Sequence, residues 1–287
     1  MAKIFKGKEV SDALTEKLLD EVNVLKGINI KPALAIIRVG SNVEDLSYEE
    51  SATKRCEKAG IHVEKFIFPE DISQASLLDI IYSINNDDSI HGALLFRPLP
   101  EQLNDHIIRS ALAPHKDVDG ITDISMAGVY ASSDMGFPPC TARACMEILD
   151  FYGIDVYGKN VVIIGRSLVV GKPVAMMALK NNGTVTICHT KTINIEKIAA
   201  GADILIVAAG AAKVVGPAYI NENQIIIDAG INFTPEGILC GDVDFEKVEP
   251  LVKAITPVPG GVGTVTTGVL LLQIVEAAKK AAVKLEI

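Results

Sequence analysis

The sequence predicts an α/β protein built from two domains, each with its own β-sheet. Short apolar runs that are typical of buried strands alternate with helical patterns along the chain, and several of these runs end in glycine or proline. At 287 residues, of which 49% are hydrophobic, the chain is long enough to bury two cores. Strands that alternate with helices are typical of parallel sheets.

A shift in composition between residues 131 and 141, ASSDMGFPPCT, predicts the domain boundary. We expect residues 1–138 to form the first domain, with the C-terminal segment 268–287 packed back onto it, and residues 139–267 to form the second. The apolar patterns predict helices near 8–27, 44–60, 72–86, 103–112, 142–152 and 267–284, and strands near 33–40, 62–68, 92–96, 161–164, 184–188, 204–210, 224–230 and 254–256.

The stretch from Tyr157 to Thr192 predicts a dinucleotide-binding unit. Val161–Ile164 is a β-branched run that ends at Gly165, Gly171 opens a helical run, and a second apolar run follows at 184–188. Such a strand–turn–helix–strand unit directs unpaired N–H groups and the positive end of a helix dipole at one point, which suits a phosphate. The spacing is Gly-x-x-x-x-x-Gly and not G-x-G-x-x-G, so a purely structural turn is the alternative interpretation.

The residues after the second of these strands bear on which dinucleotide binds. An NAD site usually has a carboxylate there for the ribose 2′-hydroxyl. Here the positions hold His189, Thr190 and Lys191, and Arg166 lies in the first turn. A cationic, hydroxyl-bearing pocket suits a 2′-phosphate, so the sequence predicts NADP in preference to NAD. The alternative is that Arg166 and Lys191 are ordinary solvated charges.

Composition disfavours several other classes of partner. A net charge of −9 and a pI near 5.1 argue against nucleic acid and anionic membranes. The five scattered cysteines form no C-x-x-C pair, which indicates buried side chains in a reducing compartment. The N-terminus lacks the apolar core of a signal peptide, we expect no run of membrane-spanning length, and the histidines lack metal-site spacing. We expect a cytoplasmic protein without a metal.

Six glycine- or proline-rich strand ends predict a ligand cleft between the two domains, because open α/β sheets bind ligands beyond the carboxyl ends of their strands. At this point the chain resembles the methylenetetrahydrofolate dehydrogenase/cyclohydrolase family over essentially its whole length. The matching pieces are Val39-Gly40, Tyr48, Gly60-Ile61, His91-Gly92, Pro98-Leu99-Pro100, KDVDG at 116–120, Pro139-Cys140-Thr141, Gly165-Arg166-Ser167, Val170-Gly171-Lys172-Pro173, Cys188-His189-Thr190, Gly230-Ile231-Asn232, Gly241-Asp242-Val243-Asp244 and PVPGGVG at 257–263.

The resemblance implies an N-terminal folate-binding domain and a Rossmann-like NADP-binding domain. It implies oxidation of 5,10-methylenetetrahydrofolate to the 5,10-methenyl form, in one-carbon metabolism and purine biosynthesis, by a homodimer. Tyr48 and Asp119 would be the catalytic residues, the first against the aromatic middle of the folate and the second hydrogen-bonded to the pterin. The other implied contacts are Phe96, Pro98, Leu99, Pro257, Gly260 and Gly261 for the folate, and Gly165, Arg166, Ser167, Thr190 and Ile231 for NADP. As alternatives, Tyr48 is a surface aromatic and Asp119 a turn cap.

Two departures from the family concern its second activity, the cyclohydrolase. The family's lysine four residues after the tyrosine corresponds to Ala52, and the glutamine that supports it corresponds to Phe96. Lys54 would lie about 200° around the helix from the lysine position, and Arg55 roughly 5 Å beyond it. We therefore expect a dehydrogenase with weak or absent cyclohydrolase activity. The alternatives are a bifunctional enzyme that uses Arg55 or Lys54, and a homologue that binds its ligands without catalysis.

Overall fold

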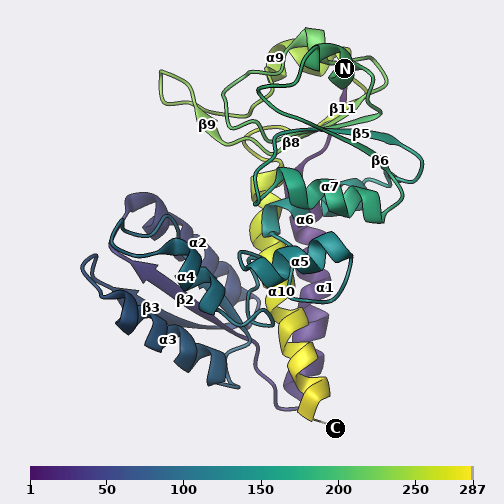
Figure 1. Cartoon of the computed structure of the whole chain (residues 1–287). Coiled ribbons are helices and arrows are strands. Elements are labelled where there is room, and N and C mark those ends of the chain that lie inside the picture. The colour runs from purple at the N-terminus through teal and green to yellow at the C-terminus, as the bar shows by residue number, and fades with distance from the viewer. Residues whose placement is uncertain (286–287) are drawn as a thin grey trace. The chain divides into compact units, whose positions relative to one another are not determined.

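The computed structural model describes residues 1–285, and of residues 44, 284 and 285 it describes only the backbone. The chain divides into two compact units (Figure 1). Unit 1 consists of Met1–Ala13 and Pro139–Val269, and unit 2 consists of Leu14–Pro138 and the chain from Leu270 onward. Residues 1–13 therefore fall in the unit that contains Pro139–Val269, where the sequence analysis had grouped them with the first domain.

The first strand explains this difference. β1 (Lys3–Ile4) pairs in parallel with β11 (Ala254–Ile255) at the edge of the unit 1 sheet. The N–H of Phe5 extends the pairing by donating to the carbonyl of Ile255 at 2.9 Å. A strand of two residues is too short to show a periodic pattern, so the sequence did not predict β1.

Unit 1 contains a six-stranded parallel sheet in the order β1-β11-β8-β7-β5-β6. Its remaining strands are β5 (Asn160–Ile164), β6 (Thr184–Cys188), β7 (Ile204–Val207) and β8 (Ile225–Asp228). β6 and β7 lie on opposite sides of β5, so the winding of the chain reverses there. Such a switch point is where open α/β sheets bind ligands, beyond the carboxyl ends of the strands.

The core of unit 1 joins alternate residues of neighbouring strands, among them Val162, Leu205 and Ile226. The helices and short elements around it are α6 (Cys140–Phe151), α7 (Gly171–Lys180), α8 (Ile195–Ala200), α9 (Phe245–Val248), the 3-10 turns η1 (Pro217–Tyr219) and η2 (Glu249–Leu251), and the antiparallel pair β9 (Asn232–Phe233) and β10 (Leu239–Cys240). The elements of six residues or fewer outside the main sheet were not predicted, because they are shorter than the window that reveals a period.

Unit 2 contains a three-stranded parallel sheet with β2 (Ala33–Val39) between β3 (His62–Phe68) and β4 (Gly92–Leu95). Different helices pack against the two faces of this sheet. Ala35, Ile37 and Val39 pack with α3 (Gln74–Asn86) and α4 (Asp105–Ala111). Arg38 points to the opposite face and pairs with Glu49 of α2 (Val43–Lys58). Figure 1 accordingly shows α2 and α3 on opposite sides of the sheet.

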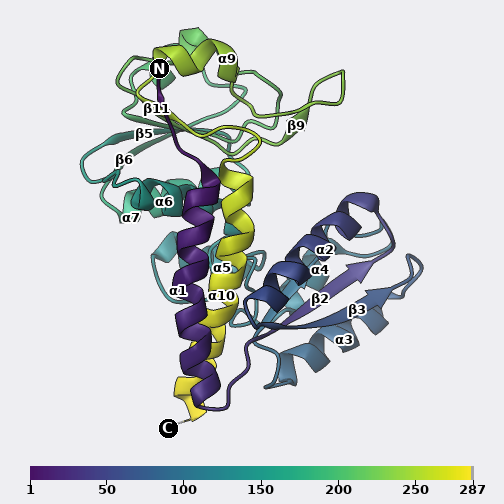
Figure 2. The ribbon, with the colours of Figure 1, turned by 180° about the vertical axis from the view of Figure 1, so that it is seen from behind.

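Two long helices, α1 (Gly7–Gly27) and α10 (Val262–Leu285), run side by side in the part of each that belongs to unit 2 (Figure 2). An ion pair of 3.2 Å between Lys279 and Glu21 joins them. The fully buried Gln273 of α10 donates to the carbonyls of Val118 at 2.7 Å and Pro138 at 3.1 Å, which anchors the KDVDG turn. The helix α5 (Asp123–Ala131) follows that turn and was not predicted.

The prediction about the cysteines is confirmed, and the prediction about the length of apolar runs is wrong. The five cysteines are free and buried, as predicted. The expectation that no run reaches membrane-spanning length is wrong, because 22 residues of α10, Val262–Val283, are long and apolar enough by composition. Of that window 72% is buried inside the protein, which is how a core helix passes the same criterion.

Candidate functional site

The turn after β5 brings the ends of β5 and β7 close together. Gly165 adopts a φ of +128°, and a Cβ there would collide with the carbonyl oxygen of Ala208, the residue after β7. A Cβ on Gly171 would in turn collide with the carbonyl of Gly165. Both glycines are therefore required by backbone packing, and together they leave the first turn of α7 directly beside the carboxyl end of β5.

The first amides of α7 have partners inside the turn, contrary to the expectation of unpaired N–H groups. Ser167 Oγ accepts from the N–H of Val170 at 3.1 Å and of Gly171 at 3.4 Å, and the carbonyl of Ser167 accepts from Lys172 at 3.0 Å. The serine folds the turn back onto itself, as serine commonly does ahead of a helix. The helix dipole and the exposed side chain of Arg166 are available to an anion at this turn.

The loop after β6 presents a hydroxyl and a cation. Thr192 Oγ1 accepts from the N–H of His189 at 2.9 Å, and His189 Nδ1 accepts from the N–H of Lys191 at 3.1 Å. These bonds fold the loop and leave the side chains of Thr190 and Lys191 exposed. Arg166, Thr190 and Lys191 are thus exposed at the carboxyl ends of the neighbouring strands β5 and β6, and their role in binding a 2′-phosphate stays a prediction.

Two buried carboxylates, which the sequence analysis gave no role, hold the loops after β7 and β8. Asp242 is fully buried and accepts from the N–H groups of Ala209 at 2.6 Å, Gly210 at 3.1 Å and Ala211 at 2.9 Å. It also accepts from the side-chain amide of Asn232 at 2.8 Å. One side chain therefore fixes both loops at the carboxyl edge of the sheet, next to the exposed Ile231, which was predicted to contact the cofactor.

Asp228, at the end of β8, binds the backbone on either side of Asp242. It accepts from the N–H groups of Gly230 at 2.9 Å, Asp242 at 3.1 Å and Val243 at 2.9 Å. Burial raises the pKa of Asp228 to about 6 despite these three hydrogen bonds, and the nearby charge of Asp242 adds to the effect. A signal for Asp228 was present in the sequence, since an isolated acid at the end of an apolar run needs several donors to be buried.

In unit 2, the side chains of Tyr48 and Phe96 are in contact. Tyr48 lies on α2 and Phe96 directly follows β4, and their rings pack edge to face with centroids 5.8 Å apart. Ala52, one helical turn after Tyr48, is fully buried. Lys54 is exposed and pairs with Glu50 at 2.5 Å, whereas Ala52 is buried, which agrees with the prediction that Lys54 lies on a different face of the helix from the lysine position. The alternative that Tyr48 is a surface aromatic does not hold, because its side chain is half-buried against Phe96.

A buried ion pair lies on the same face of the sheet. The N–H of Phe96 donates to the carbonyl of Ile37, which places Phe96 beside Arg38 of the neighbouring strand. Arg38 Nε donates to Glu49 at 2.6 Å, and Lys65 reaches the other oxygen of Glu49 at 2.9 Å. Burial alone would raise the pKa of Glu49, but these two cations outweigh it and lower the pKa. The lone arginine within the apolar run ALAIIRV was the signal for this pair, and it was missed.

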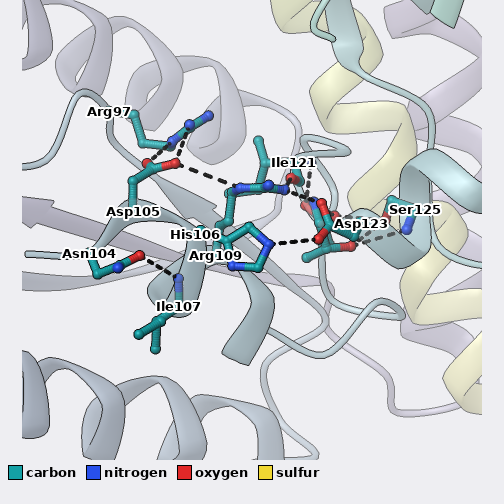
Figure 3. Close-up of polar contacts among 11 residues, drawn as sticks. Arg97, Asn104, Asp105, His106, Ile107, Arg109, Ile121, Asp123 and Ser125 are labelled. Atoms are coloured by element: carbon teal, nitrogen blue, oxygen red, sulfur yellow. Dashed lines mark hydrogen bonds and ion pairs between the residues drawn. The ribbon is translucent and has the colours of Figure 1, made fainter.

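The segment from Arg97 to Pro100 is anchored by a second network of charges (Figure 3). Arg97 donates twice to Asp105 of α4, at 2.5 and 2.6 Å. Arg109 continues the network from Asp105 to Asp123 at 2.6 Å. The bond to Asp105 raises the pKa of Arg97, and Asp119 contributes through its negative charge. Asp119 is thereby located near the start of the Pro98-Leu99-Pro100 segment, with which it was predicted to act.

The KDVDG turn that carries Asp119 is built around a different acid. Asp117 is fully buried and accepts from the N–H groups of Ile121 at 3.0 Å and Thr122 at 2.7 Å and from the hydroxyl of Ser125 at 2.6 Å. Asp117 therefore holds this turn together, from Ile121 to Ser125. Asp119 itself is half-buried.

The PVPGGVG segment belongs to unit 1 and packs against the start of the chain. The N–H of Gly7 donates to the carbonyl of Gly260 at 2.7 Å, and a Cβ on Gly7 would collide with the carbonyl of Gly261. A Cβ on Gly261 would collide with the carbonyl of Pro257. Among the described residues, no group of three or more His, Cys, Asp or Glu side chains could hold a metal ion.

Two family models match successive parts of the chain. The family model described as "Tetrahydrofolate dehydrogenase/cyclohydrolase, catalytic domain" matches residues 5–119, and "Tetrahydrofolate dehydrogenase/cyclohydrolase, NAD(P)-binding domain" matches residues 139–282. The bifunctional protein FolD of Clostridioides difficile (strain 630) is 48% identical over 276 residues, which cover 96% of each chain. The crystal structure of bifunctional FolD from Campylobacter jejuni superposes with a TM-score of 0.94 at 39% identity, covering 98% of this chain and 99% of that one. FolD from Trypanosoma brucei, complexed with NADP cofactor and inhibitor, has a TM-score of 0.90 at 29% identity and 98% coverage of each chain.

Proposed function

The chain belongs to the tetrahydrofolate dehydrogenase/cyclohydrolase family, and we propose that it oxidises 5,10-methylenetetrahydrofolate to 5,10-methenyltetrahydrofolate with NADP, while its cyclohydrolase activity is weak or absent. The observation that carries the second part is the contact of Tyr48 with Phe96 beside the buried Ala52. The first part is supported by the family and by the chemistry of the two sets of residues described above.

The oxidation makes modest demands on the protein's side chains. A hydride leaves the one-carbon bridge, and the lone pair of the adjacent folate N5 stabilises the cation that develops. The protein contributes binding, orientation and exclusion of water. In this proposal the half-buried ring of Tyr48 packs against the aromatic middle of the folate, and Asp119 accepts hydrogen bonds from the pterin. Pro98, Leu99, Phe96, Pro257, Gly260 and Gly261 shape the surrounding apolar surface.

The residues around the β5 turn fit a phosphorylated dinucleotide. NADP, when bound, supplies the acceptor for the hydride. Gly165 lets the turn pack against the carbonyl of Ala208, which keeps the first turn of α7 at the carboxyl end of β5. The exposed Arg166 and Thr190 offer a guanidinium and a hydroxyl to a 2′-phosphate, and the FolD structure from T. brucei contains NADP. Ser167 contributes by shaping the turn, and Ile231 by an exposed apolar side chain.

Hydrolysis of the methenyl cation has a further requirement, which is a group that activates water. The helix position for that group holds the fully buried methyl of Ala52, and an aromatic ring occupies the position of its polar partner. The nearby buried cation, Arg38, is paired with Glu49, and a guanidinium in a protein does not give up its proton. Loss of a positioned acid or base commonly costs about 10²–10⁴-fold in rate.

A fully bifunctional enzyme is the second candidate, favoured by the names of the relatives that are nearly half identical to this chain. In that case Arg55, half-buried one position past Lys54, is the side chain to examine. Assay of both half-reactions on one preparation separates the candidates. If the cyclohydrolase rate is comparable to the dehydrogenase rate and falls on Arg55→Ala, the bifunctional assignment replaces ours.

A further inference from the structure

Unit 2 contains a cavity of about 580 Å³ at the edge of its sheet opposite the residues discussed above. The segment that leads into β2 and the loop that leads into β4 both line it, together with His115, Lys116 and the C-terminal part of α10. Phe96 follows the far end of β4, five residues from His91, which is roughly 16 Å along a strand. The cavity is therefore separate from the folate-side residues of unit 2, and its volume is typical of ligand sites, which span about 300–1,000 Å³.

The charge of the cavity lining is opposite to that of the protein. Three lysines, Lys31, Lys116 and Lys280, line it against one acid, Asp88, although the chain as a whole carries a net charge of −9. Lys280 has a defined position, because its ammonium lies 4.7 Å from the centre of the Phe137 ring. An excess of positive charge in a concave site attracts anions.

His91 gives the cavity a buried hydrogen-bond donor. Its side chain is only 8% exposed, and its Nδ1 accepts from the N–H of Ala33 at 3.2 Å. Burial, followed by the charge of Lys116, holds the pKa of His91 below its usual value, so the ring is neutral near pH 7. The single proton of a neutral ring whose Nδ1 accepts must be on Nε2. Among the side chains that the structure describes, none accepts a hydrogen bond from that Nε2–H, and because His91 lines the cavity this donor is open to a ligand.

Lys116 supplies a second, equally buried donor. It is 4% exposed, and its ammonium donates to the carbonyls of Ile84 at 2.7 Å and Asp87 at 2.6 Å. An ammonium has three N–H groups, so these two carbonyls leave one for a ligand. His91 and Lys116 are both held in place by backbone contacts, which is the pre-organisation expected of a binding site and not of a solvated surface.

We propose that this cavity is a second ligand site for a small organic anion, whose phosphate or carboxylate oxygens accept hydrogen bonds from His91 and the lysines. The apolar part of the ligand packs against Ile90 and the alanines of α10, Ala277 and Ala281. The proposal does not depend on the catalytic assignment, because none of the lining residues belongs to the proposed folate or NADP contacts.

The test uses the full-length protein and two probes, phenyl phosphate and benzoate, with inorganic phosphate as a third arm. Each is titrated while the imidazole nitrogens of the five histidines are followed by NMR. We expect phenyl phosphate or benzoate to shift the His91 Nε2 signal saturably, with a dissociation constant on the order of millimolar. Inorganic phosphate should bind several-fold more weakly, because it has no part that packs against the apolar wall. The relative strengths of the first two identify which oxyanion the site prefers.

Two neighbouring lysines of α10 provide a matched comparison. Lys280→Ala should weaken binding by about tenfold, because that side chain lines the cavity. Lys279→Ala removes the same charge one residue earlier, where the lysine pairs with Glu21 and does not line the cavity, and it should leave binding unchanged. The proposal is overturned if none of the probes shifts His91 saturably up to about 50 mM, or if the two variants weaken binding equally, which would indicate general charge screening.

Discussion

Phe96 packs edge to face against Tyr48, with an angle of 64° between the rings and 5.8 Å between their centroids. Such a pair contributes about 0.5–1.5 kcal/mol beyond the area that it buries. The contact joins α2 to the end of β4 and places an apolar edge where the family resemblance implies a glutamine. With Ala52 buried one turn further along α2, this side of the proposed folate pocket offers packing and little proton chemistry.

Restoring the polar pair should restore hydrolysis. The double variant Ala52→Lys, Phe96→Gln should raise the cyclohydrolase rate about 100-fold or more, because it returns an ammonium and its polar partner to adjacent positions. Phe96→Gln is needed to make room, since Ala52 is fully buried. The rate of methenyltetrahydrofolate loss measures the effect, and retained dehydrogenase activity shows that the variant folds.

The matched control for that variant is Ser51→Lys with Phe96→Gln, which adds the same charge on the exposed side of α2. If this control gains as much hydrolysis as the double variant, charge and not position is responsible, and our explanation of the lost activity fails.

Arg166→Ala should discriminate between the two dinucleotides. Loss of a charge-assisted hydrogen bond to the 2′-phosphate costs about 1.5–3 kcal/mol. The Michaelis constant for NADP should therefore rise roughly 10- to 100-fold, while that for NAD changes little. Steady-state kinetics with both cofactors provide the measurement, and Lys197→Ala, an exposed lysine on α8, is the control. An equal increase for NAD and NADP would contradict the role given to Arg166.

Asp242 should control the loops after β7 and β8. Asp242→Ala leaves three backbone N–H groups and the Asn232 amide without their acceptor, which should lower the free energy of unfolding by about 2–4 kcal/mol. The isosteric Asp242→Asn keeps one acceptor oxygen and should lose less. Urea unfolding measures both, and a wild-type midpoint for Asp242→Ala would show that the loops do not depend on it.

Asp228 should make stability depend on pH. Its pKa is raised from 3.8 to about 6 in the folded protein, so the folded state binds the proton more tightly than the unfolded state does. Between about pH 4 and 6 the folded state therefore holds more protons, and the free energy of unfolding falls as the pH rises. Two pKa units correspond to about 3 kcal/mol, a cost that persists above pH 6.

The measurement for this effect is the difference in unfolding free energy between the wild type and Asp228→Asn, taken at pH 4 and at pH 7. The wild type should lose about 2 kcal/mol relative to the variant between these values, because part of the full loss has already occurred at pH 4. A flat difference would show that the three hydrogen bonds to Asp228 balance its burial, and a difference of the opposite sign would show that they outweigh it; either result would contradict the raised pKa.

Many helices and strands could be predicted from the sequence because they are long segments with a clear hydrophobic period. The helix at 8–27, the strand at 62–68 and the run at 161–164 have the predicted type and nearly the predicted bounds. β1 was not predicted, because two residues are too few to show a period. Its partner, β11, is also about 250 residues away in the sequence. Membership of the family was predicted from motifs such as KDVDG and is confirmed.

Only part of the candidate site could be predicted from the sequence. Glycine positions such as Gly165 follow from turn geometry, but the acids that hold the loops, Asp228 and Asp242, act through backbone groups that no motif identifies. The same holds for the pair of Arg38 with Glu49, because the partner of a buried charge depends on the packing of α2 against β2. The homodimer, the cytoplasmic location, the role in purine biosynthesis and the cleft stay predictions.

The central claim is tested most directly by assaying both half-reactions on one preparation of the purified protein. With methylenetetrahydrofolate and NADP we expect steady formation of NADPH and methenyltetrahydrofolate. With methenyltetrahydrofolate alone we expect loss no faster than in buffer. Enzymatic hydrolysis at a rate comparable to the oxidation would contradict the account, and absence of NADPH formation would refute the dehydrogenase assignment itself.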